Sequence, residues 1–172
     1  MSYKILPITS LIHQVIKASF DQIDVACDMT LGQGFDAEFL ADISRVVYAF
    51  DVQQMAIDQI SNPMISCILG NHKDVDKYIK EEVDVFMFNL GYLPNSDKKI
   101  QTSSNDTILA LDKCLKMLSS KGIITIVTYC GNQEQIDERN NVDKWCQCHD
   151  LVVLKLMMNI DNAPIGYVVS KR

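Results

Sequence analysis

The sequence has no uninterrupted apolar run of the roughly 20 residues that a membrane-spanning helix needs, because charged or turn residues break every such run. Its start, MSYKILPITS, also lacks the long apolar core of a secretory signal. We therefore expect a protein that has no membrane segment and stays in the cytoplasm. There the six cysteines are expected to remain reduced thiols.

An excess of basic residues is missing as well. The 16 Lys and Arg residues face 22 Asp and Glu residues, which gives a formal net charge of −6. Because phosphate contacts supply most of the affinity of a nucleic-acid binder, this balance argues against a broad RNA-binding surface. An RNA contact would have to use a local patch, for which Lys98 and Lys99 are the candidates.

The sequence also lacks a metal-binding arrangement of cysteines. Cys146, Cys148 and His149 lie close together, but no second pair follows at the spacing of a zinc finger. We therefore expect no metal site. No internal repeat, low-complexity tract or linker interrupts the chain, so a single domain over residues 1–172 is expected.

Strand-like and helix-like patterns alternate along the chain. Apolar and β-branched runs predict strands at 24–30, 45–51, 64–69, 83–89, 123–129, 151–158 and 165–171. Apolar residues at helical spacing predict helices at 9–20, 36–44, 52–60, 73–81, 104–119 and 133–146. Such alternation predicts an α/β fold with a mostly parallel, seven-stranded sheet and helices on both faces.

The segment between the last two predicted strands, NIDNAP, is too short for a helical crossover. These strands should therefore pair antiparallel as a terminal hairpin. A Rossmann-like sheet that ends in a hairpin is typical of class I S-adenosylmethionine-dependent methyltransferases. Nicotinamide dehydrogenases usually continue with another parallel unit or a substrate domain.

The first predicted strand runs into DMTLGQGFD, residues 28–36. Gly32 and Gly34 allow a tight turn and a close approach of a ligand at the head of the next helix. The third glycine of a dinucleotide-binding G-x-G-x-x-G motif is missing. Asp28 and Asp36 would repel a pyrophosphate but suit the sulfonium and amino group of S-adenosylmethionine. The turn therefore favours S-adenosylmethionine over NAD.

Polar residues also end the second and third predicted strands. Asp51 lies at about the 20-residue separation from the first strand at which an acidic residue bonds ribose hydroxyls, and Gln53 offers an adenosine contact. Asn71 and His72 follow the third strand at the same edge of the sheet. They are candidates for adenine binding or substrate orientation, with a structural role for His72 left open.

The fourth predicted strand ends in FNLGYLP, residues 88–94. Amino-directed methyltransferases place Asn or Asp, two small or apolar residues and Tyr at this point, most familiarly as N-P-P-Y. The Asn89 carbonyl and a turn carbonyl from Leu90 and Gly91 can accept the hydrogens of an amine and align its lone pair with the S–CH₃ bond. Tyr92 offers a flat face on which a base can stack. We interpret this turn as the acceptor site.

With these motifs the chain resembles the YtqB-type rRNA methylase family, associated with methylation of the aminomethyl group of 5-aminomethyl-(2-thio)uridine at the tRNA wobble position. The longest match is FNLGYLPNSDKKIQTSSNDT, close to the family motif N-L-G-Y-L-P-x-x-D-K-x-x-x-T-x-x-x-x-T, with Asp97, Lys98, Thr102 and Thr107 in place. The resemblance covers almost the whole chain. It implies a Rossmann-like methyltransferase, S-adenosylmethionine as the donor, and the anticodon loop of tRNA as the partner.

The motifs and the resemblance together give the expected site. The catalytic residues are Asn89, Tyr92 and Asp97. The cofactor-binding residues are Asp28, Thr30, Gly32, Gln33, Gly34, Asp36, Asp51, Gln53, Asn71 and His72. The substrate-binding residues are Leu90, Gly91, Lys98, Lys99 and Thr102. The chain departs from the family at Gln33, Ala37 and Asn71, and in the loop YCGNQEQ (129–135), where relatives have a His- and Gly-rich YHGHPGG-like loop.

Two other functions stay open from the sequence. One is a methyltransferase for another amine acceptor, such as an rRNA base, a small molecule or a protein. The other is a nucleotide-binding module without catalytic activity, against which the retained Asn89, Tyr92, Asp97 and Lys98 argue. The sequence leaves the oligomeric state open, a homodimer included.

Overall fold

The computed structural model describes residues 6–91 and 104–172. The strands are β1 (Ile23–Asp28), β2 (Ser44–Asp51), β3 (Ile65–Leu69), β4 (Val83–Asn89), β5 (Leu118–Thr128), β6 (Leu151–Leu156) and β7 (Ile165–Lys171). The helices are α1 (Ile8–Ser19), α2 (Phe35–Ala41), α3 (Gln54–Asp58), the 3₁₀ helix η1 (His72–Asp74), α4 (Val75–Tyr78), α5 (Ser104–Met117) and α6 (Gln133–Cys148).

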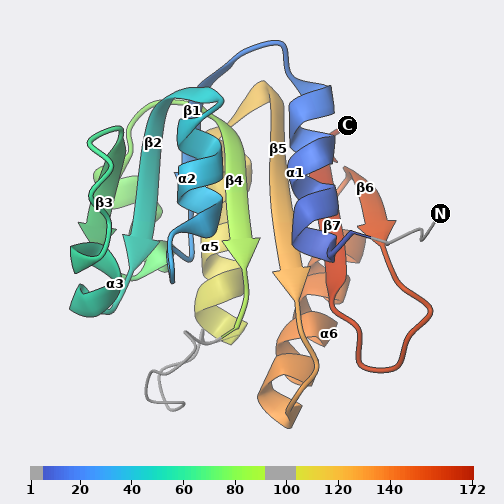
Figure 1. Cartoon of the computed structure of the whole chain (residues 1–172). Coiled ribbons are helices and arrows are strands. Elements are labelled where there is room, and N and C mark those ends of the chain that lie inside the picture. The colour runs from blue at the N-terminus through green and yellow to red at the C-terminus, as the bar shows by residue number, and fades with distance from the viewer. Residues whose placement is uncertain (1–5, 92–103) are drawn as a thin grey trace, which may run out of the picture.

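The strands form one sheet in the order β3-β2-β1-β4-β5-β7-β6 (Figure 1). β1 to β5 pair in parallel, while β7 runs antiparallel to both of its neighbours, β5 and β6. The predicted mostly parallel sheet with an antiparallel terminal hairpin is therefore confirmed.

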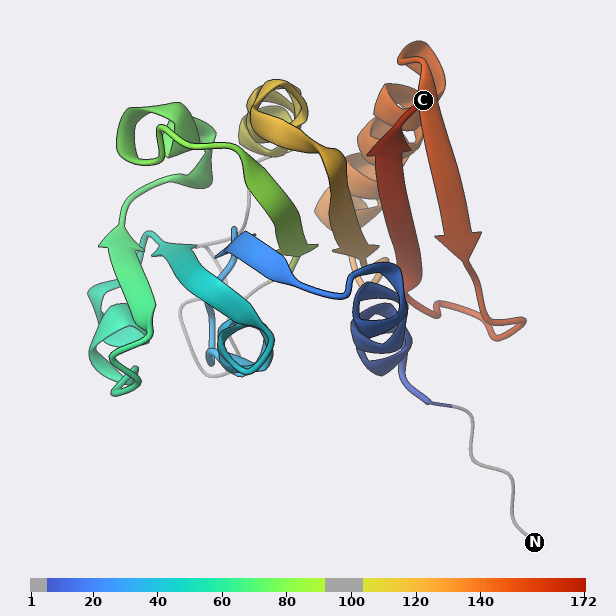
Figure 2. The same cartoon turned by 90° about the horizontal axis from the view of Figure 1, so that it is seen from above.

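Helices cover both faces of the sheet (Figure 2): α1, α2 and α3 lie on one side, and α4, α5 and α6 lie on the other. β4 shows why both faces are apolar, because successive side chains of a strand point to opposite sides. Phe86 and Phe88 pack into the core under α5 and α6, and Val85 and Met87 pack into the core under α1 and α2. This explains the apolar run VFMF (85–88), which is typical of a strand buried on both faces.

The predicted helix at 73–81 is shorter than expected. The Asn71 side chain accepts a hydrogen bond from the Lys73 N–H at 3.0 Å and caps η1, and α4 ends at Tyr78. Ile79 then adopts an extended conformation (φ −102°, ψ 129°) and is 2% exposed. Burial of this side chain in the core under α5 therefore ends the helix early.

β5 begins at Leu118, five residues before the predicted strand start and within the predicted helix 104–119. Its pairing with β4 is irregular between Val83 and Val85, and the Ser119 hydroxyl donates to Asp84 at 2.7 Å there. At Gly122 an added Cβ would lie 2.7 Å from the Leu118 side chain and 3.1 Å from the Asp84 carbonyl. Gly122 thus permits a close approach inside the strand, although it lies between the predicted helix at 104–119 and the predicted strand at 123–129.

All six cysteines are free thiols. Within residues 6–91 and 104–172, no helix is both long enough and apolar enough to pass through a bilayer.

Candidate active site

The predicted site residues follow the carboxyl ends of neighbouring parallel strands. Asp28 and Asn89 end β1 and β4, Asp51 ends β2, and Asn71 follows β3. β1 lies between β2 and β4 in the sheet. The strands that follow β1, which are β2 and β3, extend toward one edge of the sheet, and β4 and β5 extend toward the other edge. This is the topological switch point, outside which open α/β sheets bind their ligands.

Asp51 holds the glycine turn that follows β1. Its Oδ2 accepts the N–H of Gly32 at 3.0 Å, and its Oδ1 accepts the N–H of Gln53 at 2.8 Å. Gly32 and Gly34 have φ angles of 51° and 82°, in the left-handed region that favours glycine. The carboxylate therefore organises both turns that border the site and keeps lone pairs available for a ligand.

Asp28 is an unusual carboxyl group at the end of β1. It is 1% exposed, and its Oδ1 accepts the N–H of Thr30 at 2.9 Å. Burial, followed by the nearby negative charge of Asp36, raises the pKa of Asp28 to about 8. Its Oδ2 has no hydrogen-bond partner among the described residues. A cation bound beside this group would therefore favour its ionised form.

His72 is buried, with 8% of its surface exposed. The carbonyl of Met29 can only accept, so the ring Nδ1 must donate to it, at 3.2 Å. Burial lowers the pKa of His72, which keeps the ring neutral and leaves Nε2 as an acceptor. Nε2 is buried and has no partner in the part of the chain that the structure describes.

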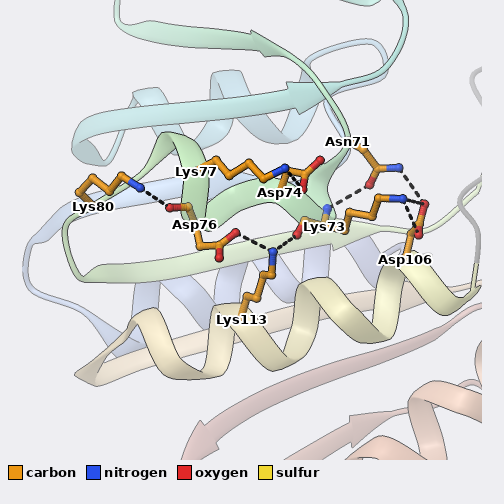
Figure 3. A network of polar contacts seen from close by, with 8 residues as sticks. All are labelled: Asn71, Lys73, Asp74, Asp76, Lys77, Lys80, Asp106 and Lys113. Atoms are coloured by element: carbon orange, nitrogen blue, oxygen red, sulfur yellow. Dashed lines mark hydrogen bonds and ion pairs between the residues drawn. The ribbon is translucent and has the colours of Figure 1, made fainter.

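Asn71 belongs to a network that ties the end of β3 to α5 (Figure 3). Its Nδ2 donates to Asp106 at 2.8 Å, and the Lys73 ammonium contacts the two oxygens of the same carboxylate at 3.0 and 3.2 Å. Burial raises the pKa of Asp106, but the hydrogen bonds from Lys73 and Asn71 outweigh it and hold the pKa below its usual value. Lys113 adds bonds of 2.6 Å to the Lys73 carbonyl and to Asp76.

Asn89 connects several elements of the site through hydrogen bonds. Its backbone N–H donates to Thr30 Oγ1 at 2.8 Å, which joins the end of β4 to the turn after β1. Its side-chain Nδ2 donates to Asp36 Oδ2 at 3.3 Å, and its Oδ1 accepts the Tyr129 hydroxyl at 2.9 Å. Asn89, which was predicted to bind the acceptor amine, thus lies directly beside Asp36, the acid that follows the glycine turn.

Two members of this cluster were missed by the sequence reasoning. His13, on α1, donates from Nε2 to Asp36 Oδ1 at 2.7 Å. Tyr129 follows β5 immediately, so the rule that found the other strand-end residues applies to it too. His13 gives no such signal, because a single histidine on an amphipathic helix does not reveal its partner.

The remaining predicted site residues differ in their burial and in whether they lie among the described residues. Leu90 is fully buried and its N–H donates to the Val127 carbonyl at 2.9 Å, so its side chain is not available to an acceptor. Gly91 lies against the Tyr129 ring, and Gln33 is exposed in the turn. Outside the described residues are Tyr92, Asp97, Lys98, Lys99 and Thr102.

Residues 47–168 match the protein family described as "Putative rRNA methylase". The chain belongs to this family. A solved rRNA methylase from Clostridium thermocellum, titled as putative, is 31% identical, with a TM-score of 0.92 over 99% of this chain and 100% of that one. A methyltransferase from Streptococcus mutans, also titled as putative and solved with SAH, is 28% identical, with a TM-score of 0.88 over 98% of this chain and 100% of that one.

A curated relative from Arabidopsis thaliana is named chloroplastic tRNA (mnm(5)s(2)U34)-methyltransferase. It is 28% identical over 95% of this chain and 69% of its own length. The predicted family and the predicted class, an S-adenosylmethionine-dependent methyltransferase with a Rossmann-like fold, are confirmed by these matches.

Proposed function

We propose that the protein is an N-methyltransferase that transfers the methyl group of S-adenosylmethionine to the aminomethyl group of 5-aminomethyl-(2-thio)uridine at the tRNA wobble position. The observation that carries this proposal is the Asn89 amide at the end of β4, which is bonded to Asp36, the acid that follows the glycine turn, at the switch point of the sheet. The name of the Arabidopsis relative supports tRNA as the acceptor.

The cofactor would lie along the edge of the sheet from β3 to β4. The free lone pairs of Asp51 suit the ribose hydroxyls, because both of its oxygens are already directed by backbone N–H groups. The acceptor Nε2 of His72 suits the exocyclic amine of adenine. Asp36 lies beside this part of the edge, and the sulfonium and amino groups of the cofactor would favour the ionised form of Asp28. Two carboxyl groups at this position disfavour the pyrophosphate of NAD.

Transfer to an amine requires a neutral nitrogen, since its lone pair attacks the methyl carbon as the S–CH₃ bond breaks. The sulfonium becomes a neutral thioether, the nitrogen gains a positive charge, and one proton must leave an acceptor that arrives as an ammonium. The rate should therefore rise with pH until the bound amine is deprotonated. A proton-accepting role for Asp97 and stacking by Tyr92 remain predictions outside the described residues.

The acceptor is tested with two tRNA preparations, one that carries the unmethylated aminomethyl group at the wobble uridine and one that lacks it. Methyl incorporation from labelled S-adenosylmethionine, located by nucleoside mass spectrometry, should occur only in the first preparation. Incorporation into both alike, or into neither, would reject this acceptor. Methyl incorporation into rRNA fragments instead would show that the acceptor is an amine of rRNA and not of tRNA.

Asn89→Ala tests the active-site assignment. Loss of the group that aligns the amine should lower turnover by about 10²-fold or more. The affinity for S-adenosylmethionine, measured by calorimetry, should barely change because Asn89 contacts the acceptor in this scheme. Near-normal turnover of this variant would refute the proposed role of the β4 turn.

A further inference from the structure

Four side chains from separate segments of the fold form one continuous series of hydrogen bonds. The Tyr129 hydroxyl after β5 contacts Asn89 Oδ1 on β4 at 2.9 Å, and Asn89 Nδ2 contacts Asp36 Oδ2 on α2 at 3.3 Å. Asp36 Oδ1 contacts His13 Nε2 on α1 at 2.7 Å. The sequence reasoning placed only the two central members in the site.

The chemistry of the partners fixes the orientation of the Asn89 amide. An ionised carboxylate only accepts hydrogen bonds, so the NH₂ group must face Asp36. The carbonyl oxygen then faces Tyr129, whose hydroxyl donates to it. Burial, with the negative charge of Asp36 as a second cause, raises the pKa of Tyr129, so the phenol keeps the proton that it donates.

His13 and Tyr129, the two ends of this hydrogen-bonded series, are each held by packing against a neighbouring residue. The His13 ring stacks on Phe39 of α2, with ring centroids 3.7 Å apart and planes 1° from parallel. The Tyr129 ring lies beside the predicted acceptor turn, where an added Cβ on Gly91 would be 3.7 Å from ring atoms Cδ2 and Cε2. The Tyr129 hydroxyl and His13 Nε2 therefore stand at defined positions relative to β4 and α2.

We propose that Tyr129 and His13 are positioning residues for methyl transfer, which hold the Asn89 amide in a single orientation, Tyr129 directly and His13 through Asp36. This inference rests on the proposed role of Asn89 toward the acceptor amine. The carbonyl oxygen has two lone pairs, of which Tyr129 uses one and the acceptor amine uses the other. A flipped amide would instead donate to the nitrogen lone pair that must attack the methyl group.

The first test observes the amide itself and needs no acceptor. In the ¹⁵N-labelled full-length protein, the Asn89 side-chain NH₂ signals are identified by their loss in Asn89→Ala. Tyr129→Phe and His13→Ala should each shift or broaden these signals. His13→Gln keeps an N–H donor near the position of Nε2 and should restore them. Signals unchanged in both Tyr129→Phe and His13→Ala would overturn the proposal.

The second test is a double-mutant cycle on turnover. Loss of one oriented hydrogen bond in Tyr129→Phe should lower kcat about tenfold, with KM for S-adenosylmethionine unchanged. The same substitution should have no further effect in an Asn89→Ala background, because Tyr129 acts through Asn89. An equal loss in both backgrounds would overturn the proposal. Tyr48→Phe, which removes an exposed hydroxyl bonded to Glu81, is the matched control.

The two tests separate this inference from the proposed function. If the unaltered protein methylates no tRNA, the acceptor assignment fails, and the amide signals still decide whether Tyr129 and His13 orient Asn89. Thermal melts accompany each variant. His13→Gln keeps a polar side chain and Tyr129→Phe keeps an aromatic ring, so both should stay folded. If His13→Ala unfolds, these two variants still test the proposal.

Discussion

Replacement of Asp51 by alanine should separate cofactor binding from the integrity of the fold. Asp51 is half-buried at the end of β2 and accepts backbone N–H groups from Gly32 and Gln53. A carboxylate has about four lone-pair positions, so two remain, and in the proposed site these bind the ribose hydroxyls of S-adenosylmethionine. Asp51→Ala removes all four at once without a change in the buried apolar core.

The size of the effect follows from the number of bonds lost. A hydrogen bond to a charged group contributes about 1.5–3 kcal/mol, so two bonds to the ribose correspond to about 3–6 kcal/mol. Because each 1.4 kcal/mol is a factor of about ten, the dissociation constant should rise by roughly 10²- to 10⁴-fold. Release of the Gly32 N–H adds to this loss, since the glycine turn is no longer held.

Isothermal calorimetry with S-adenosylmethionine and with NAD measures both the loss and the selectivity. Asp58→Ala is the matched control, because Asp58 is an exposed carboxylate of α3 that accepts a hydrogen bond from Gln54 of the same helix. The control should bind S-adenosylmethionine normally, and circular dichroism should show that both variants stay folded. Unchanged affinity in Asp51→Ala, or NAD affinity equal to that for S-adenosylmethionine, would refute the reasoning.

Three further predictions follow from the site. The pKa of Asp28 is raised from 3.8, the value expected for the unfolded chain, to about 8 in the folded protein. The stability that the protonated carboxyl group contributes is therefore complete below pH 3.8 and is lost as pH rises through 8. Urea unfolding should therefore show a decline of up to about 1.4 kcal/mol per pH unit between these values that is absent in Asp28→Asn; equal slopes would contradict it. Gly34→Ala should lower the free energy of unfolding by at least about 1–2 kcal/mol, since φ is 82° and the new Cβ would meet Ile60. Gly91→Ala is the control, because its Cβ would make only ordinary contacts and its melting temperature should not change. Replacement of Lys98 and Lys99 by alanine should weaken tRNA binding and flatten its salt dependence without a change in cofactor affinity, and an unaltered salt slope would exclude them as phosphate contacts.

Much of the site edge could be predicted from the sequence for a topological reason. Parallel strands bring their carboxyl ends to one edge, so Asp28, Asp51 and Asn89 had to lie near one another once the alternation of strands and helices was recognised. The contact between His13 and Asp36 could not be predicted in the same way. The apolar spacing of α1 defines its buried face, but where that helix packs depends on the tertiary structure.

Element ends were less predictable where tertiary contacts decide them. Leu118 fits the helical pattern that precedes it, yet it pairs with Val83 in the sheet. Ile79 fits a continued helix, yet it turns out of α4 into the core. In both cases burial against a distant segment outweighs the local pattern.

The adjacency of β1 and β4 has a consequence for how the protein acquires its activity. Six elements lie between these two strands in the chain, namely α2, β2, α3, β3, η1 and α4, so the pairing of β1 with β4 closes a long loop. Non-local pairings of this kind carry a loop-closure cost that slows folding relative to local helix formation. The hydrogen bond between Asn89 and Asp36 spans the same junction. After dilution from denaturant, methyl transfer should therefore recover later than the helical signal, and enzymatic activity would report the completion of the slowest pairing in the sheet.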